Sequence, residues 1–205
     1  MPGRRRSYHH GDLRRALLDA TLSLAAEFGP AGVTLRQAAD RAGVSQTAPY
    51  RHFDDKAAML AAASEEGFRL LQARMTAAAR PFAAEPMRRI GAWGRCYVDF
   101  AVAHTAHFRL MFGQGSPQKS ATAALQAAAR DTFQLLFQTV ESGARTARLG
   151  AADTRELALK IWSLAHGIAV LAIDGQTVFL GVPRERAGGV AEGAVTALLA
   201  GYANP

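Results

Sequence analysis

The chain contains a single cysteine and no hydrophobic run long enough to cross a bilayer, and each absence excludes a class of protein. Cys96 alone cannot form an intramolecular disulfide or a multi-cysteine metal site. The most apolar run, residues 161–173, contains His166 and is shorter than the ~20 residues that a membrane-spanning helix needs. Polar residues such as Tyr8 and Asp12 follow the basic start MPGRRRS, where a secretory signal has an apolar core. We therefore expect a cytoplasmic protein with no membrane partner.

Strand patterns and the common catalytic motifs are also missing. No stretch alternates apolar and polar residues for long, whereas helical periodicity runs through almost the whole chain. The sequence has no GxGxxG motif, no Walker loop and no GxSxG elbow. His104 and His107 have metal-ligand spacing, but no nearby acidic residue or cysteine on their face completes a site. We expect an all-α protein that is not an enzyme and binds no cofactor and no metal.

Positive charge is concentrated in the first quarter of the chain. Lys and Arg number 24 against 17 acidic residues, a net charge of +7. Residues 1–53 hold 8 Arg and 4 acidic residues, which gives 8 − 4 = +4. This asymmetry favours a nucleic-acid partner, with residues 4–6 as a basic arm, although an arginine-rich composition in general would explain part of it.

Residues 34–53, TLRQAADRAGVSQTAPYRHF, predict two short helices joined by a glycine turn. Thr34 and Gln37 have the spacing of a capping box, which starts the first helix. Gly43 supplies the left-handed conformation that ends it, and Ser45 follows as the cap of a second helix. This arrangement is a helix-turn-helix, in which the second helix reads DNA.

Pro49 lies within the second helix, where a proline costs about 3 kcal/mol if it is in the helix interior. Counted from Ser45, Pro49 is the fourth helical residue, so only the first intrahelical hydrogen bond is lost. We therefore expect a short reading helix with a tightened first turn. Its polar side chains project outward and can donate to phosphates and purine edges.

These residues resemble the amino-terminal domain of TetR-type (TetR/AcrR) transcriptional regulators. Tyr50, His52, Phe53 and Lys56 match the end of the family signature, with Pro49 where a leucine is usual. The likeness extends back through YHHGDLRRALLDATLSLAAEFG. Farther along, Trp162 with the His-Gly pair at 166–167, together with HFRLMF at 107–112, is similar to the so-called WHG type of carboxy-terminal domain.

The expected architecture is a three-helix helix-turn-helix domain at residues 1–55 and a larger helical bundle at residues 56–205, about nine helices in all. The first helix is expected from Asp12 to the Gly29-Pro30 pair, and a connector helix from Asp54 or Asp55 to Met75. Two last helices, near 154–174 and 184–199, carry more apolar residues than a monomer of this size needs to bury. We expect them to form the contact of a homodimer.

Two sets of candidate site residues follow. The expected DNA-binding residues are Thr34, Arg36, Ser45, Gln46, Thr47, Tyr50, Arg51, His52 and Lys56. The expected ligand-binding residues are Tyr97, Phe100, His104, Phe108, Phe137, Trp162 and His166. The second set is by default hydrophobic core, although aromatic residues with two histidines are equally able to line an apolar pocket.

The resemblance implies a repressor that binds palindromic operator DNA as a homodimer and responds to an unknown small molecule. Two alternatives stay open from the sequence. One is an activator or a constitutive DNA binder without an effector, and the other is a helical-bundle enzyme with a vestigial DNA-binding domain.

Overall fold

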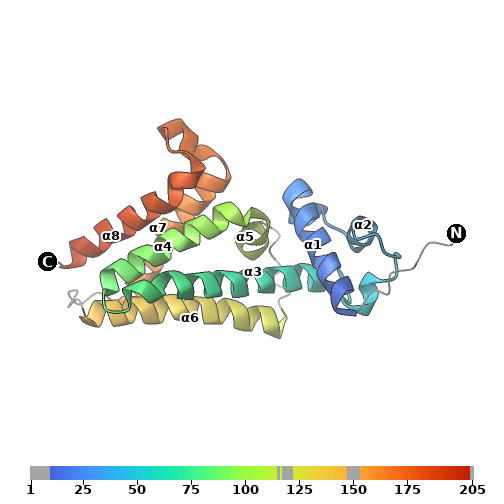
Figure 1. The fold of residues 1–205 in the computed structure, drawn as a ribbon, viewed down its shortest axis with the longest axis horizontal. Coiled ribbons are helices and arrows are strands. Elements are labelled where there is room, and N and C mark those ends of the chain that lie inside the picture. The colour runs from blue at the N-terminus through green and yellow to red at the C-terminus, as the bar shows by residue number, and fades with distance from the viewer. Residues whose placement is uncertain (1–9, 115, 117–121, 147–152, 204–205) are drawn as a thin grey trace. The chain divides into compact units, whose positions relative to one another are not determined.

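A computed structural model describes residues 10–114, 116, 122–146 and 153–203, and within these ranges the chain is all-α. Figure 1 shows its helices in chain order. Their bounds are α1 His10–Phe28, α2 Leu35–Arg41, α3 Lys56–Ala79, α4 Pro86–Ala103, α5 Thr105–Phe112, α6 Ala123–Thr146, α7 Thr154–Ile173 and α8 Ala187–Ala203. Short 3-10 turns lie at Pro30–Gly32, Pro49–Arg51, Arg80–Phe82, Gln176–Leu180 and Arg184–Arg186. The basic arm at residues 4–6 falls outside the described residues.

Two details differ from the expectation. The first helix begins at His10, so Asp12 lies within its first turn instead of capping it. The described ranges hold eight α-helices where about nine were expected. The expected reading helix is the one missing from this number, because a 3-10 turn at Pro49–Arg51 lies in its place.

The chain folds into two compact units, and both are discontinuous in sequence. The first unit comprises Met1–Glu66 and Ala106–Gln126, and the second comprises Gly67–Thr105 and Ala127–Pro205. The helices α3, α5 and α6 therefore each contribute residues to both units.

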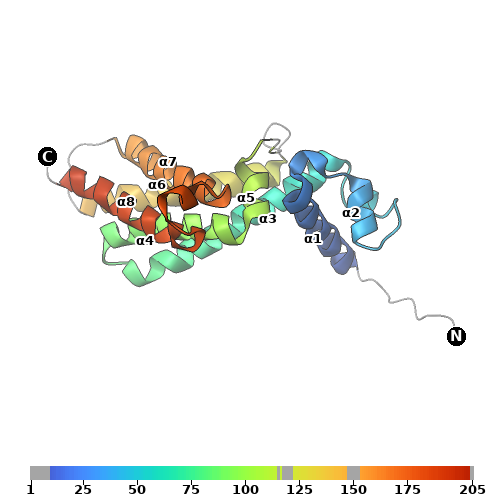
Figure 2. The ribbon, with the colours of Figure 1, turned by 90° about the horizontal axis from the view of Figure 1, so that it is seen from above.

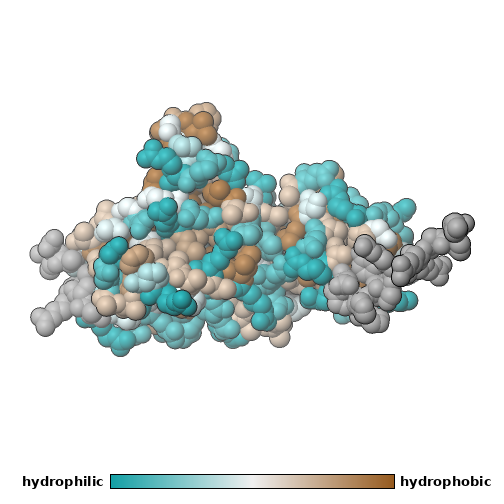
Figure 3. All heavy atoms as spheres, in the orientation of Figure 1, coloured by the Kyte–Doolittle hydropathy of each residue, from teal (hydrophilic) through white to brown (hydrophobic). Residues whose placement is uncertain are grey.

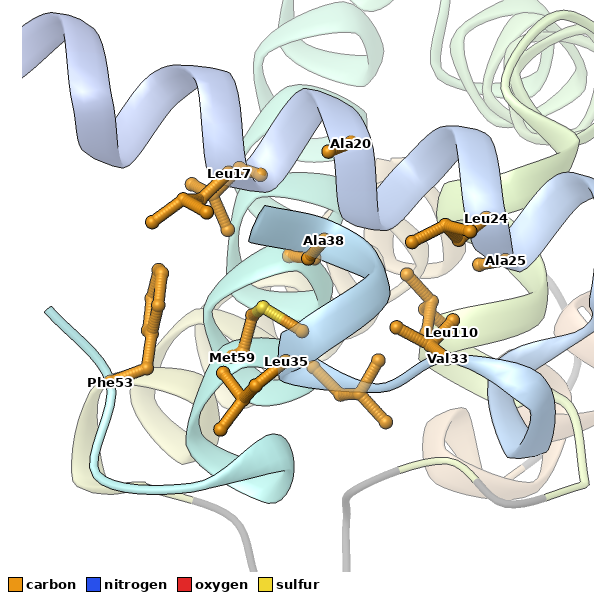
Figure 4. Packing of buried hydrophobic residues seen from close by; sticks show 13 residues of the cluster. Leu17, Ala20, Leu24, Ala25, Val33, Leu35, Ala38, Phe53, Met59 and Leu110 are labelled. Atoms are coloured by element: carbon orange, nitrogen blue, oxygen red, sulfur yellow. The ribbon is translucent and has the colours of Figure 1, made fainter. Parts of the chain in front are cut away.

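The first unit is built around an apolar core that α1, α2 and α3 share (Figure 4). Leu24 of α1 lies on the side of Val33, Leu17 lies on the side of Phe53, and Met59 enters from α3. Leu110 of α5 is fully buried in the same core. Most of α5 thus belongs with the amino-terminal helices, although α4 lies between α3 and α5 along the chain.

In the second unit, α4 packs against both α7 and α8, and Figures 1 and 2 show these helices side by side. The approach of α4 to α8 is close because two glycines lie on the contact face. A β-carbon at Gly91 would lie 3.1 Å from the Thr196 hydroxyl oxygen, and one at Gly94 would lie 3.0 Å from a Val195 methyl carbon. Side chains at these positions would push the two helices apart.

We predict that Gly94→Val destabilises the second unit by about 1–3 kcal/mol, because the added methyl groups overlap Val195. Urea denaturation followed by tryptophan fluorescence measures this loss, since Trp93 and Trp162 both lie in the second unit. The matched control is Gly201→Val, where a β-carbon meets nothing within 4 Å. Equal destabilisation by the two variants would contradict the close approach of α4 and α8.

The helix α7 keeps much of its apolar surface exposed. It is the one helix in the described ranges whose length and composition would allow it to cross a membrane, but it packs against α4 and α8. Only 33% of its most apolar stretch is buried within the chain. Leu159 and Leu171 are 55% and 49% exposed. An apolar surface of this kind in a single chain is typical of a contact with another molecule.

Candidate nucleic-acid interface

The first helix of the predicted motif, α2, begins and ends as its sequence indicates. The hydroxyl oxygen of Thr34 accepts a hydrogen bond from the Gln37 amide at 3.1 Å and donates to the Gln37 side-chain oxygen at 2.7 Å. Gly43 has φ +68°, and its amide donates to the Asp40 carbonyl. The Val44 amide donates to the Ala39 carbonyl, which completes a Schellman motif. The predicted helix start and the glycine turn are confirmed.

The reading segment, defined here as residues 45–52, is a run of tight turns and not an α-helix. Pro49 has no amide hydrogen to donate to the Ser45 carbonyl, which accepts from the Ala48 amide at 2.9 Å instead. The Arg51 amide donates to Ala48 and the His52 amide to Pro49, so the i to i+3 pattern of a 3-10 helix continues. The Ser45 hydroxyl contacts the Thr47 hydroxyl at 3.2 Å and caps no helix. The tightening expected of the first turn therefore extends through the whole segment.

Two apolar anchors hold the reading segment at its ends. Val44 packs against the core of the first unit from the glycine turn, and Phe53 is buried in that core with 4% of its surface exposed. Figure 4 shows Phe53 pointing toward Leu17. The Arg14 guanidinium lies over the Phe53 ring, 5.6 Å from its centroid. Because the backbone hydrogen bonds between the anchors join only residues three or four apart, the packing of these side chains fixes where the segment lies on the core.

Seven of the nine predicted DNA-binding residues are exposed at this surface. They are Thr34, Arg36, Ser45, Gln46, Thr47, Tyr50 and Arg51. Tyr50 is 61% exposed, so both its ring and its hydroxyl are accessible at this surface. The Gln46 amide nitrogen donates to an Asp40 carboxylate oxygen, which ties the reading segment to α2.

His52 and Lys56 are half-buried. The His52 Nε2 atom is buried and has no hydrogen-bond partner among the described residues. The Lys56 ammonium donates to the Ala31 carbonyl at 2.7 Å, which stabilises the turn after α1 and leaves two further donors on the nitrogen. The sequence did not predict this structural contact, because Ala31 is 25 residues away along the chain.

Four arginines of the first unit differ in whether an acidic residue of the described part pairs with them. Arg41 pairs with Glu27 at 2.7 Å, and Arg15 pairs with Glu66 at 2.8 Å, so both are held by internal contacts. Arg36 and Arg51 are exposed and form no ion pair within the described part of the chain. An unpaired guanidinium presents its donor fork to a phosphate or to the O6 and N7 atoms of guanine.

An ion-pair network in the first unit joins α1, α3 and α5. One terminal nitrogen of the Arg15 guanidinium, Nη1, donates to both oxygens of the Glu66 carboxylate, at 2.8 and 2.9 Å. His107 Nε2 of α5 lies 3.4 Å from the same carboxylate. Burial lowers the pKa of His107, while the negative charge of Glu66 opposes that shift. Glu66 thus connects the connector helix to both of its neighbours.

In the second unit, the structure brings together three of the predicted ligand-binding residues through Tyr97. The indole nitrogen of Trp162 donates to the Tyr97 hydroxyl at 3.1 Å, and His166 Nδ1 lies 2.8 Å from the same oxygen. Because the indole only donates, the Tyr97 hydrogen is left to bond an unprotonated His166 Nδ1. Burial raises the pKa of Tyr97 and lowers that of His166. Both groups are therefore neutral at pH 7.

The other predicted ligand-binding residues make different contacts. Phe100 stacks on His104 with ring centroids 5.1 Å apart, and the Arg155 guanidinium lies 5.9 Å from the Phe137 ring centroid. Phe108 belongs to the first unit, where it contacts Phe112. Their roles stay predictions from the sequence.

Two aromatic residues that are absent from the candidate set lie beside Tyr97, Trp162 and His166. Trp93 stacks on Tyr97 with centroids 5.6 Å apart, and Phe133 lies edge-on against Trp162 at 4.9 Å. Trp93 is 2% exposed, and its indole nitrogen has no hydrogen-bond partner among the described residues. The four-residue spacing from Trp93 to Tyr97 was the signal that could have found it.

We predict that protonation of His166 destabilises the protein as the pH falls. The folded pKa is lowered, so the unfolded chain binds the proton more readily and stability decreases as the pH falls through the unfolded value of about 6.5. Urea denaturation between about pH 7.5 and 5.5 should show this loss, with a smaller slope in His166→Gln. The slope of His107→Gln is measured for comparison, because burial lowers the pKa of His107 as well. An unchanged slope in His166→Gln would contradict the neutral histidine.

The described residues contain no group of three or more His, Cys, Asp or Glu placed to hold a metal ion. Burial raises the pKa of the Cys96 thiol to about 11, so thiolate is scarce at neutral pH and the thiol is a poor nucleophile.

A capped helix, a glycine turn and an exposed reading segment on one apolar core define a helix-turn-helix protein. Residues 17–63 match the family model described as bacterial regulatory proteins of the tetR family. Residues 90–199 match the tetracyclin repressor-like C-terminal domain, which covers more than half of the chain. The chain belongs to the TetR family of transcriptional regulators. A comparison with curated proteins finds no match.

Solved structures of similar proteins agree with this assignment. A Rhodococcus sp. RHA1 protein of unknown function is 34% identical with a TM-score of 0.79, and the match covers 96% of this chain and 100% of that one. A transcriptional regulator from the same organism is 22% identical with a TM-score of 0.73, covering 94% and 98%. The fatty acid degradation regulator FadR from Bacillus halodurans, at 13% identity and a TM-score of 0.75, covers 92% and 97%. The last two show the fold alone.

Proposed function

We propose that this regulator is a ligand-responsive repressor that binds a palindromic operator as a homodimer in the cytoplasm. In this proposal residues 1–55 bind DNA, and residues 56–205 dimerise and bind the effector. The observation that carries DNA binding is the reading segment, in which Arg51 is exposed and unpaired among the described residues beside Gln46, Thr47 and Tyr50. This set combines a bidentate donor for guanine with an amide for adenine and groups that reach phosphates.

The exposed apolar faces of α7 and α8 support the homodimer. Leu164, Leu171 and Val190 are 36%, 49% and 44% exposed, although each belongs to a helix whose other side packs in the second unit. A two-fold contact between the two helices of each protomer would bury these side chains in a four-helix bundle. One short reading segment has too few base contacts for a specific site, so a dimer also supplies the second half-site.

The neutral polar group at Tyr97, Trp162 and His166 supports an effector site in the second unit. The buried Trp93 indole nitrogen lacks a hydrogen-bond partner among the described residues, and a buried donor without a partner is unfavourable. An effector with an apolar body and one hydrogen-bond acceptor would satisfy that nitrogen. Since the described groups here carry no charge at pH 7, we infer an uncharged effector.

We infer that the effector weakens DNA binding through α3 and α5, which contribute to both units. A ligand shifts a conformational equilibrium only by its differential affinity for two states, and coupling of about 1–3 kcal/mol is usual. Glu66 is the contact on α3 that holds both Arg15 and His107. Its position makes Glu66 the residue through which a movement of α3 or α5 would reach α1.

The effector proposal is tested with a panel of uncharged aromatic and aliphatic compounds. Compounds that quench Trp93 or Trp162 fluorescence should lower operator affinity by about 5- to 150-fold. Phe100→Trp, which enlarges a fully buried side chain, should abolish this response. Quenching without any change of operator affinity would show that the second unit is only a dimerisation scaffold. Tighter binding or higher transcription with the ligand would instead identify an activator.

A further inference from the structure

The segment between α7 and α8 projects three apolar side chains into solvent. Val178, Phe179 and Leu180, here called the apolar knob, are 66%, 84% and 84% exposed. Figure 3 shows hydrophobic residues gathered at the tip of this segment. The knob is an ordered turn, because Gly181 donates to the Val178 carbonyl and Val182 donates to the Thr177 carbonyl. Exposed phenylalanine and leucine on an ordered turn are typical of a binding surface.

An apolar groove of about 410 Å³ lies beside the knob. Its apolar walls are Ile168, Leu171, Leu180, Val182, Ala187 and Val190. No charged residue lines it, and its two polar lining residues, Gln176 and Thr177, stand against six apolar ones. The groove is therefore suited to an apolar occupant and not to water or an ion.

We propose that the apolar knob of each protomer enters the apolar groove of a second copy of this chain. The inference rests on the proposed function, in which the protein is a homodimer. A two-fold contact uses the same patch on both subunits, so the patch must be complementary to itself. This patch meets that condition, since a convex and a concave feature of the same uncharged, apolar character lie side by side within it.

Continuity with the exposed face of α7 also favours a second copy as the occupant. Leu171 lines the groove and is 49% exposed, so the groove opens onto the face proposed to form the four-helix contact. A small apolar molecule in the groove would leave Val178 and Phe179 in water. A partner chain buries the knob and fills the groove in one contact, and Phe179 is its largest side chain.

The test compares dimer dissociation constants by sedimentation of the full chain. Phe179→Asp should raise the dissociation constant about 100-fold or more, because each dimer loses the contact twice. Phe28→Asp is the matched control, since Phe28 is 53% exposed in the first unit, and it should leave the dissociation constant unchanged. Equal dissociation constants for wild type and Phe179→Asp would overturn the proposed contact of the knob while leaving the proposed homodimer intact. A wild type that stays monomeric at micromolar concentration would overturn both.

Cysteine pairing tests the groove separately, on a Cys96→Ser background that removes the only native thiol. A mixture of Phe179→Cys and Val190→Cys chains should form a disulfide-linked heterodimer under mild oxidation. Neither chain alone should cross-link to a comparable extent. Efficient cross-linking of Phe179→Cys with itself would place two knobs against each other and overturn the assignment to the groove.

Discussion

Arg51→Ala will weaken operator binding by about 30-fold or more and will change random-sequence binding much less. A bidentate base contact contributes about 1–3 kcal/mol of discrimination, and a dimer loses it in both half-sites, which amounts to about 2–6 kcal/mol. Arg51 is the residue for this contact because it is exposed on the reading segment and unpaired within the described ranges. Fluorescence anisotropy with operator and scrambled duplexes at one salt concentration measures the two affinities.

Two other variants serve as comparisons for Arg51→Ala. Arg74→Ala removes an exposed arginine of α3 in the second unit and should leave both affinities unchanged. Lys56→Ala should weaken both by the same factor and flatten the salt dependence by roughly 0.9 per lost phosphate contact. If Arg51→Ala lowers both affinities equally, Arg51 binds the phosphate backbone and specificity lies elsewhere.

Phe53→Ala will destabilise the first unit by about 3–5 kcal/mol and abolish operator binding. Phe53 is 4% exposed in the core and anchors the end of a reading segment whose own hydrogen bonds are of the 3-10 type and not those of an α-helix. Removing the ring leaves a cavity near Leu17 and takes away the face on which Arg14 lies. The segment then loses its fixed position even in chains whose helices stay folded.

Amide hydrogen exchange measures this effect, because both tryptophans lie in the second unit and report only on that unit. Protection of the α1 and α2 amides should fall in Phe53→Ala, while the second unit and the dimer stay intact. Phe28→Ala is the control, since that ring lies in the same unit and is 53% exposed. Unchanged protection in Phe53→Ala would show that the reading segment does not depend on its anchor.

Local signals predicted the helix-turn-helix well. Thr34 and Gly43 act within a few residues of themselves, through one cap and one left-handed turn, so sequence spacing is enough to identify them. The sequence predicts that Pro49 tightens the reading helix, but it confines this tightening to the first turn. The missing amide hydrogen shifted the Ser45 carbonyl to an i to i+3 partner, and the rest of the segment continued in that pattern.

Contacts between distant residues were not predictable in the same way. Nothing in the spacing of HFRLMF indicates that Leu110 packs in the core of the first unit, or that His107 lies near Glu66. The interpretation of the aromatic stripe as core or pocket stayed open because periodicity shows which face is apolar but not what fills it. Likewise the high exposure of Phe179 depends on where the segment after α7 turns, which two glycines with positive φ decide.

The most direct measurement of the central claim is a footprint of the purified protein on the intergenic DNA upstream of its own gene, with excess random DNA present. The account predicts one protected palindrome, with half-sites separated by a whole number of turns at about 10 to 10.5 base pairs each, and two protomers per site. Protection of a single asymmetric half-site by a monomer, or no preference over the random DNA, would contradict it.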